Sequence, residues 1–382
     1  MHLRADPLTS TRETAAADLA IVLVHYDTPR LAADAVRSLR DDVHRSGVRA
    51  SFLIVDNGSD AAGAEMLRAL DVPVIAPGRN LGYAGGVNLG VSRMQAPFVI
   101  IMNPDVFVRP GCIAALCGAL REGAAAAGPR FCWDEAGRLL LPPTERRDVT
   151  SAALARLGVR GPRWARAARR RWRRHARRHW LAREPLPSHA LSGALLAFRR
   201  DAWDAIGPFD EGFRLYFEET DWLMRLARSG RPARYVPAAR ARHTYNQSAR
   251  RQPEADAWFA ASARRFDDRY FGRAARWLRR LERVADSPEG RAYTDPRIRA
   301  ARVDADGAAV DVSPITATSA APLWIELSSG PAGYPAAAEC LADGQPTWRV
   351  PGEVWEDLAP GSYLLRLVDA AGREREAFTF HR

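Results

Sequence analysis

The first 130 residues of the chain alternate short apolar runs with longer amphipathic segments. Each apolar run has the length of a β-strand, and the segments Leu31–Val43 and Gly111–Arg121 between them are typical of helices. Such an alternation indicates βαβ units. It predicts an α/β fold, with a mainly parallel twisted sheet flanked by helices. The apolar runs are Ala20–Tyr26, Ser51–Asp56, Val72–Ala76 and Phe98–Asn103.

A second block with the same kind of pattern begins near His189 and is followed by a different one. We expect a strand at Ala190–Phe198 and helices at Asp201–Ile206, Glu219–Ser229 and Glu254–Val284. From about residue 293 onward, short alternating runs are separated by turn signals, which predicts a small all-β sandwich. Its strands are expected at Pro322–Leu327, Ser362–Val368 and Glu376–Phe380. The predicted organisation is a disordered tail over 1–17, an α/β domain over 18–285 with an insert at 145–183, and a β domain over 293–382.

The insert is the most basic part of a basic chain, whose net charge is +11 and whose cations are all arginine. Placed on a helix, its alanines and the tryptophans Trp172 and Trp180 share one side, and most arginines lie on the other. A basic helix with tryptophans suits an anionic membrane surface. We therefore interpret residues 163–183 as a peripheral membrane contact. Nucleic-acid binding through the same arginines is the alternative.

Cysteine spacing and hydropathy indicate the cellular compartment to expect for this protein. The four cysteines form no CxxC pair and show no ligand-like spacing with histidines, which argues against a zinc site or a disulfide framework. No stretch reaches the roughly 18 to 20 apolar residues of a membrane span, and Met1–Asp18 lacks the apolar core of a signal peptide. We expect a cytoplasmic protein, peripheral at the inner face of the plasma membrane.

Polar residues follow the first two predicted strands. In open α/β sheets ligands bind outside the carboxyl ends of the strands, so these residues are candidates for nucleotide contacts. A carboxylate such as Asp56 can accept a hydrogen bond from the imide of uracil or thymine. Alternatively, the same residues only form a turn and cap the next helix. The candidates are Tyr26, Asp27, Asp56, Asn57 and Ser59.

A glycine-rich segment follows the third predicted strand and opens a helix. Glycines there let the backbone approach a diphosphate closely, and a helix N-terminus offers free N–H donors. The alternative is a tight turn in which the glycines serve packing. The donor-binding candidates of this segment are Asn80, Gly82, Gly85, Gly86 and Asn88.

Two further groups of residues carry candidate chemistry. Asn103 and Asp105 end the fourth strand, where a carboxylate can hold Mg²⁺ or Mn²⁺, and His243 is a candidate for completing that metal site. Carboxylates crowded at a helix start favour one another's protonation, which can produce a general base of raised pKa. Acidic residues also gather at helix starts to complement the helix dipole, so that role stays open. The acidic candidates are Glu218, Glu219 and Asp221.

The ordered motifs VDNGSD, NLGYAGGVN, MNPDV and LSGALLAFRRDAWDAIGPFDEGFRLYFEETDWLMRLARSGRPARYVPAARARH closely resemble family 2 glycosyltransferases of the GT-A fold, especially their rhamnosyltransferase-like branch. The resemblance covers residues 18–248. It implies that Asp56 contacts the nucleotide base and that Asp105, in the NPD form of the DxD motif, binds the metal with His243. It also implies that the EETD stretch supplies the catalytic base and that Ser192 and Gly193 lie beside the acceptor.

The function that the resemblance implies is inverting transfer of rhamnose or a hexose from a nucleotide sugar, with dTDP-rhamnose first and UDP-sugars next. The acceptor is expected to be a lipid-linked glycan in surface polysaccharide synthesis, and the cofactor Mg²⁺ or Mn²⁺. Family members commonly carry Glu-Asp where this chain has Glu218-Glu219, so the base remains open among Glu218, Glu219 and Asp221. A catalytically inactive glycan-binding or scaffold protein, working through its β tail, is the alternative class.

Overall fold

The computed structural model describes residues 17–158, 161–244, 254–285, 298–316, 322–329 and 332–382. The expected disordered tail therefore falls, except for Ala17, outside the described residues. A nine-stranded sheet organises the N-terminal two-thirds, in the order β3-β2-β1-β4-β8-β6-β9-β5, with β7 paired to β9. The strands are β1 (Leu19–His25), β2 (Ala50–Asp56), β3 (Val74–Ile75), β4 (Phe98–Met102), β5 (Val106–Val108), β6 (Ala126–Cys132), β7 (Leu186–Pro187), β8 (Leu195–Arg199) and β9 (Ala233–His243).

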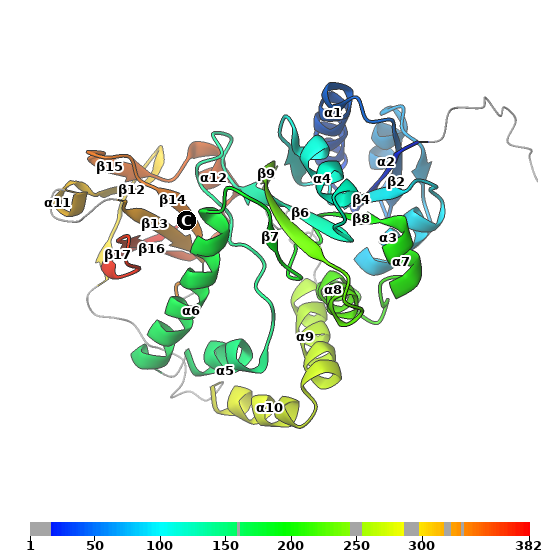
Figure 1. The fold of residues 1–382 in the computed structure, drawn as a ribbon. Coiled ribbons are helices and arrows are strands. Elements are labelled where there is room, and N and C mark those ends of the chain that lie inside the picture. The colour runs from blue at the N-terminus through cyan, green and yellow to red at the C-terminus, as the bar shows by residue number, and fades with distance from the viewer. Residues whose placement is uncertain (1–16, 159–160, 245–253, 286–297, 317–321, 330–331) are drawn as a thin grey trace, which may run out of the picture.

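The first four strands are parallel, as the βαβ pattern predicts, because each is reached by a helical crossover. The strand β8 breaks this arrangement, since it is antiparallel to both β4 and β6. The other parallel pair is β6 with β9. The α/β fold class is confirmed as a mixed, mostly parallel sheet that is covered by helices (Figure 1).

Helices pack on both faces of the sheet and form two apolar cores. One core contains α1 and α4, and the other contains α3, α7 and α8. The helix expected over Glu254–Val284 is two helices instead, because Gly272 takes a left-handed conformation with φ of 52° and ends the first of them. The bounds are α1 (Pro29–Ser46), α2 (Ala61–Arg68), α3 (Gly82–Ser92), α4 (Cys112–Arg121), α7 (Arg200–Ile206), α8 (Glu218–Arg228), α9 (Ala255–Phe271) and α10 (Arg273–Ala285).

The C-terminal region is rich in β-structure, as expected, and contains two sheets. One has the order β10-β17-β16-β13-β14 and the other β11-β12-β15. Their shared core also contains Trp133, Leu139 and Leu141, which follow β6 in the N-terminal part. The elements are β10 (Arg299–Ala300), β11 (Arg302–Asp304), β12 (Gly307–Asp311), α11 (Ser313–Thr316), β13 (Trp324–Ser328), β14 (Ala337–Cys340), β15 (Thr347–Arg349), α12 (Gly352–Asp357), β16 (Ser362–Val368) and β17 (Glu374–His381).

The basic insert forms α5 (Val149–Gly158) and α6 (Pro162–Trp180), and α6 lies against the C-terminal sheet (Figure 1). Trp172 and Trp180 are buried there, and the Trp180 ring stacks on Trp324 of β13 at 5.6 Å between centroids. The interpretation that these tryptophans contact lipid is therefore wrong, because the tertiary fold covers them.

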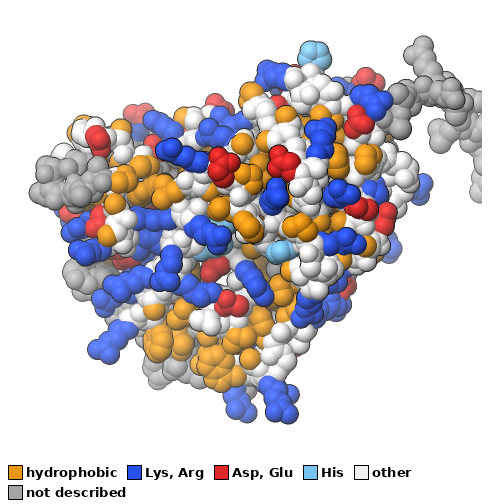
Figure 2. Space-filling model, in the orientation of Figure 1, with side chains coloured by type: hydrophobic (Ala, Val, Ile, Leu, Met, Phe, Trp, Pro, Cys, Tyr) orange, Lys and Arg blue, Asp and Glu red, His pale blue; other side chains and the backbone are white. Residues whose placement is uncertain are grey.

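The arginines of α6 divide between the interior and the surface. Arg169 and Arg173 are buried and pair with Glu374 and Glu326 of the C-terminal sheet, whereas every fourth residue from Arg166 onward is exposed. Figure 2 shows cationic side chains on the surface of this part of the molecule. No helix among the described residues is long and apolar enough to cross a membrane. The exposed arginines are Arg163, Arg166, Arg170, Arg174 and Arg178.

Candidate active site

A cavity of about 490 Å³ opens at the carboxyl ends of β1 and β4. It is bounded by the start of α3, the segment before β8, the start of α8 and the end of β9. Segments far apart in sequence therefore meet at the edge of the sheet where ligands of α/β folds bind. Eleven of the residues singled out from the sequence line it: Tyr26, Asn57, Asn80, Gly82, Asn103, Asp105, Ser192, Gly193, Glu218, Glu219 and His243.

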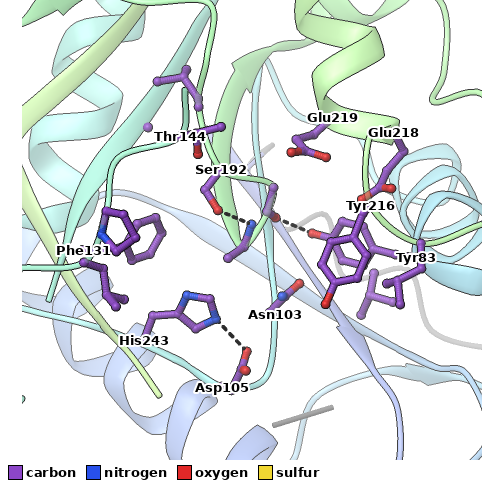
Figure 3. Close-up of a pocket in the computed structure, with 18 of the residues that line it drawn as sticks. Tyr83, Asn103, Asp105, Phe131, Thr144, Ser192, Tyr216, Glu218, Glu219 and His243 are labelled. Atoms are coloured by element: carbon purple, nitrogen blue, oxygen red, sulfur yellow. Dashed lines mark hydrogen bonds and ion pairs between the residues drawn. The ribbon is translucent and has the colours of Figure 1, made fainter. Parts of the chain in front are cut away.

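Glu218 and Glu219 begin α8 and lie on one side of this cavity (Figure 3). The two residues before them, Tyr216 and Phe217, have φ angles of 64° and 71°. Bulky residues avoid the left-handed region, and each such residue costs about 1–3 kcal/mol. Two in succession turn the chain so that the acidic side chains face the cavity. Gly193 leaves room for them, because a Cβ there would lie 3.2 Å from the Cγ atom of Glu219.

Glu218 is buried and Glu219 is half-buried beside it, and their surroundings shift the protonation of both. Burial and the neighbouring Glu219 raise the pKa of Glu218 well above its usual value. Loss of water also raises the pKa of Glu219, while hydrogen bonds from backbone amides and from the Thr220 hydroxyl, which lies 3.1 Å from its Oε1, oppose that rise. The pair therefore favours a protonated Glu218 beside an ionised Glu219. An ionised carboxylate with raised pKa is the chemistry of a general base.

Asp221 does not reach the cavity, although it lies only two residues beyond Glu219. Its side chain is fully buried and accepts hydrogen bonds from Arg269 at 2.6 Å, from the Tyr270 hydroxyl at 2.7 Å and from Arg225 at 2.9 Å. These contacts join α8 to α9. The structure therefore removes Asp221 from the candidate bases and gives it a structural role.

Asp105 and His243 lie on the other side of the cavity (Figure 3). The register of β5 with β9 pairs Val106 with His243, so the neighbouring aspartate is brought to 3.4 Å between its Oδ1 and the Nε2 of the histidine. One carboxylate and one imidazole fit the small set of protein ligands that Mg²⁺ or Mn²⁺ takes beside a diphosphate. Within the described ranges no group of three or more His, Cys, Asp and Glu side chains gathers around a possible metal position.

Asp56 lies beneath the cavity rather than in its lining. Its Oδ1 accepts hydrogen bonds from the Ser59 hydroxyl at 2.8 Å and the Ser59 amide at 3.0 Å, and it lies 3.2 Å from Nδ1 of His25. Burial alone would raise the pKa of Asp56, but the hydrogen bonds from His25 and Ser59 hold it at about 2. The Thr28 amide donates to Nε2 of His25, so Nδ1 carries the proton that faces Asp56. This network fixes the strand ends that carry Tyr26 and Asn57.

The glycine-rich segment is mostly helix, not loop. Gly82 begins α3 with φ of 72°, and a Cβ there would lie 2.5 Å from the Arg214 carbonyl oxygen. Gly85 and Gly86 are buried inside α3 and do not line the cavity. A Cβ on Gly86 would lie 2.7 Å from Cγ1 of Val24, so this glycine serves helix–sheet packing.

Two other candidates also lie away from the cavity lining. The Asn88 amide both donates to the Phe209 carbonyl and accepts from the Phe209 amide, each at 3.0 Å, which fixes the turn before α8. Asp27 has φ of 47° at the end of β1 and does not line the cavity, and neither does Ser59. The structure thus gives Asn88 and Ser59 structural contacts in place of the predicted donor contacts.

Several cavity residues were not singled out from the sequence. Tyr83 donates from its hydroxyl to the Gly193 carbonyl at 2.5 Å, and burial together with Glu218 raises its pKa well above the usual value. Its place inside the NLGYAGG motif was the available signal. Arg214 lies 4.4 Å from the ring centroid of Trp258, and both line the cavity. Nothing in the local sequence indicates that pair, because it forms between distant segments.

The sheet is mixed and mostly parallel, as in the GT-A fold, and acidic residues and a histidine gather at one of its edges. Residues 20–207 match the family described as Glycosyl transferase family 2. The N-acetylglucosaminyl-diphospho-decaprenol L-rhamnosyltransferase of Mycobacterium tuberculosis is 32% identical over 218 residues, which cover 53% of this chain and 69% of the relative. The chain belongs to glycosyl transferase family 2.

Other similar proteins include a hexosyltransferase and a mannosyltransferase of known structure. A low-salt glycan biosynthesis hexosyltransferase of Haloferax volcanii is 30% identical over 105 residues, covering 26% of this chain and 32% of the relative. The structure of a mannosyltransferase from Pyrobaculum calidifontis, in complex with GDP-Man and Mn²⁺, is 14% identical with a TM-score of 0.44. That similarity covers 74% of this chain and 78% of the other. The family match and the rhamnosyltransferase relative confirm the family membership expected from the motifs.

Proposed function

We propose that this protein is an inverting glycosyltransferase that moves rhamnose or a hexose from a nucleoside diphosphate donor to a hydroxyl group of a glycan. The observation that carries the proposal is one cavity with two kinds of group on opposite sides. A pair of carboxyl groups, Glu218 and Glu219, lies on one side, and Asp105 with His243 lies on the other. A transferase needs a base for the acceptor and a site for the leaving diphosphate.

The donor nucleotide is assigned to the strand ends of β1 and β2 and to the start of α3. Tyr26, Asn57 and Asn80 line this part of the cavity and supply a ring and amide groups. The first N–H groups of α3 are bonded within the protein, the Gly82 amide to Oδ1 of Asn80 at 2.8 Å and the Tyr83 amide to the Arg214 carbonyl at 3.1 Å, so the diphosphate is not assigned to them. Asp56 acts there as a positioning residue, because it holds His25 and the turn after β2.

Asp105 and His243 are assigned as the protein ligands of Mg²⁺ or Mn²⁺. When bound, the cation would neutralise charge on the diphosphate leaving group. Asn103 lines the cavity next to this pair and can orient donor hydroxyl groups through its amide.

Glu219 is assigned as the base. Its carboxylate takes the proton of the acceptor hydroxyl, whose oxygen attacks the anomeric carbon from the side opposite the leaving nucleoside diphosphate. A new C–O bond forms while the bond to the diphosphate breaks, which inverts the anomeric configuration. The Thr220 hydroxyl donates a hydrogen bond to Oε1 of Glu219 at 3.1 Å, which favours the ionised form of Glu219. Ser192 and Gly193 are assigned to the acceptor side beside it.

The finer substrate assignment rests on the names of relatives. The rhamnosyltransferase of M. tuberculosis supports dTDP-rhamnose as donor and a lipid-linked saccharide as acceptor, and the hexosyltransferase supports UDP-hexoses next. Such an acceptor would place the enzyme at the cytoplasmic face of a membrane.

Contact of the enzyme with an anionic membrane surface would depend on Arg170 and Arg174 of α6, which are exposed. Flotation with acidic vesicles tests this contact. Equal flotation after replacing both arginines by alanine would contradict it.

The test of the proposal is a donor panel of dTDP-rhamnose, UDP-hexoses and GDP-mannose with the full chain. We expect at least one donor to raise the melting temperature and to be hydrolysed slowly. Glu219→Gln should lower the rate of donor hydrolysis by about 10²- to 10⁴-fold and keep the donor-induced shift in melting temperature. Glu65→Gln, at an exposed position of α2, is the matched control. Full turnover by Glu219→Gln, or no binding of any donor, would overturn the proposal.

A further inference from the structure

The cavity extends beyond the transferase core into a wall made by the insert and the C-terminal region. Trp172 of α6 and the pair Tyr334-Pro335 before β14 line the same cavity as the carboxyl groups of α8. Residues 141–145, which lie between β6 and α5 in the chain, complete this wall. Residues separated by almost 200 positions therefore border one space. Its lining residues are Leu141, Pro142, Pro143, Thr144, Glu145, Trp172, Tyr334 and Pro335.

This wall is held in place by a set of hydrogen bonds. Leu140 and Ala338 exchange both backbone hydrogen bonds, each at 2.8 Å, which ties the segment to β14. The Trp180 indole donates to the Leu141 carbonyl at 2.9 Å, and the Ser328 hydroxyl donates to the Pro335 carbonyl at 2.8 Å. Groups fixed in this way need little ordering when a ligand binds.

The surface of the wall is aromatic and apolar with a few polar groups. The rings of Trp172 and Tyr334 lie 6.4 Å apart between centroids and are tilted by 36°. Thr144 and Glu145 are partly buried next to them, and burial raises the pKa of Glu145. Figure 3 shows Thr144 beside Ser192, on the acceptor side of the site. Apolar faces with a few hydrogen-bonding groups are typical of sites for small organic ligands.

We propose that this wall is an acceptor subsite for a carbohydrate, in which Tyr334 supplies a stacking surface and Thr144 and Glu145 bind hydroxyl groups. A sugar ring offers apolar C–H faces and hydroxyl edges, which match both components. Oε1 of Glu145 pairs with Nε of Arg171 at 3.5 Å, and an alkyl chain would remove water from this ion pair without offering it a hydrogen bond, which is unfavourable. The inference rests on the proposed function, because it assigns the acceptor side of that same cavity. It gives the C-terminal β region a part in substrate binding.

The experiment measures binding of maltotriose, chitotriose and a rhamnose-containing trisaccharide to the full chain by saturation-transfer NMR. We expect at least one trisaccharide to bind and Tyr334→Ala to raise its Kd at least tenfold. Tyr334→Phe keeps the ring and should stay within twofold of the wild type. Trp355→Ala removes a partly exposed aromatic ring from the same region but outside the cavity, and it should also stay within twofold.

Three results would overturn the inference: no trisaccharide binds the wild type, Tyr334→Ala binds as tightly as the wild type, or geranylgeranyl phosphate proves to be the ligand that Tyr334→Ala loses. The melting temperature of each variant separates unfolding from lost binding. Thermal shifts with dTDP or UDP and Mn²⁺ test the proposed function separately. A chain that binds nucleotide but no glycan would refute only this subsite, whereas one that binds glycan through Tyr334 but no nucleotide would refute the transferase.

Discussion

At the scale of single residues, the protonation of Glu218 and Glu219 depends on what surrounds them rather than on their own chemistry. Glu218 is buried and Glu219 is half-buried, and the loss of water around them disfavours their ionised forms. Their positions follow from two left-handed residues, Tyr216 and Phe217, which no helix preference would select. Strain of this kind persists where the surrounding structure compensates for it.

The first prediction concerns the pH dependence of turnover. Because a base must be ionised and the pKa of Glu219 is raised above its usual value of 4.5, activity should fall with decreasing pH at a midpoint above 4.5. Thr220→Ser keeps the hydroxyl that donates to Glu219, whereas Thr220→Val removes it. Since a hydrogen bond to a charged group contributes about 1.5–3 kcal/mol, Thr220→Val should move the midpoint upward by about one to two pH units. Turnover measured from about pH 4 to 9 checks this, and identical midpoints for the two variants would contradict it.

The second prediction concerns the metal. Removing divalent cations with EDTA should abolish turnover, and Mn²⁺ or Mg²⁺ should restore it, because leaving-group charge needs neutralising. His243→Ala should raise the Mn²⁺ concentration needed for half-maximal turnover at least tenfold. His44→Ala, at an exposed position on α1, is the control and should leave that concentration unchanged. Activity that survives EDTA would remove the cation from the mechanism.

Asp221 illustrates which site residues could be predicted from the sequence. The motif order located the cavity, and Glu218, Glu219, Asp105 and His243 all line it. The sequence could not separate Asp221 from its neighbours, because its partners Arg269 and Tyr270 lie 48 and 49 positions away. Local patterns indicate where acids gather, whereas long-range ion pairs decide which of them face the ligand.

At the scale of elements, the same limit applies to α3. The sequence placed a helix after the glycine-rich segment, but Gly86 and Gly90 line its contact with β1 rather than a diphosphate. A Cβ on Gly86 would lie 2.7 Å from Val24, and one on Gly90 would contact Val22 even more closely. Close packing of a helix on a strand leaves no space for a methyl group. The strands β1, β2 and β4 were predicted well because each is one apolar run, and α6 was predicted as a helix but not as a buried one.

The third prediction tests this packing. Gly90→Ala should lower the free energy of unfolding by about 1–3 kcal/mol, since the added methyl group must displace Val22 and Val55. Gly118→Ala in α4 is the matched control, because no atom lies within 4 Å of its Cβ position. Alanine there should raise stability by roughly 0.5–1 kcal/mol through helix propensity. Urea unfolding followed by tryptophan fluorescence measures both, and equal effects of the two changes would refute the packing argument.

At the scale of the whole molecule, the C-terminal region is joined to the rest through α6 and through the segment after β6. Trp133, Leu139 and Leu141 belong to the core of the C-terminal sheets. Arg173 of α6 reaches Glu326 of β13 with two hydrogen bonds, at 2.6 Å and 2.8 Å, in the interior. These side chains are 3% and 1% exposed, so the ion pair is shielded from water. The two parts therefore share buried charge as well as apolar surface.

The fourth prediction uses this pair to measure the coupling between the two parts. Glu326→Leu leaves the Arg173 charge buried with a weaker set of partners, which should cost about 3–5 kcal/mol. Arg173→Met combined with Glu326→Leu removes both charges and should recover at least about 2 kcal/mol of that loss, because the desolvation penalty disappears with them. Arg37→Met, which breaks an ion pair with Asp34 whose side chains are 71% and 50% exposed, should cost below about 1 kcal/mol. Urea unfolding of the wild type, the two single variants and the double variant gives the coupling energy between Arg173 and Glu326. Strictly additive costs would mean that Arg173 and Glu326 do not stabilise each other, and that apolar packing and other ion pairs, such as Arg169 with Glu374, join α6 to the C-terminal sheet.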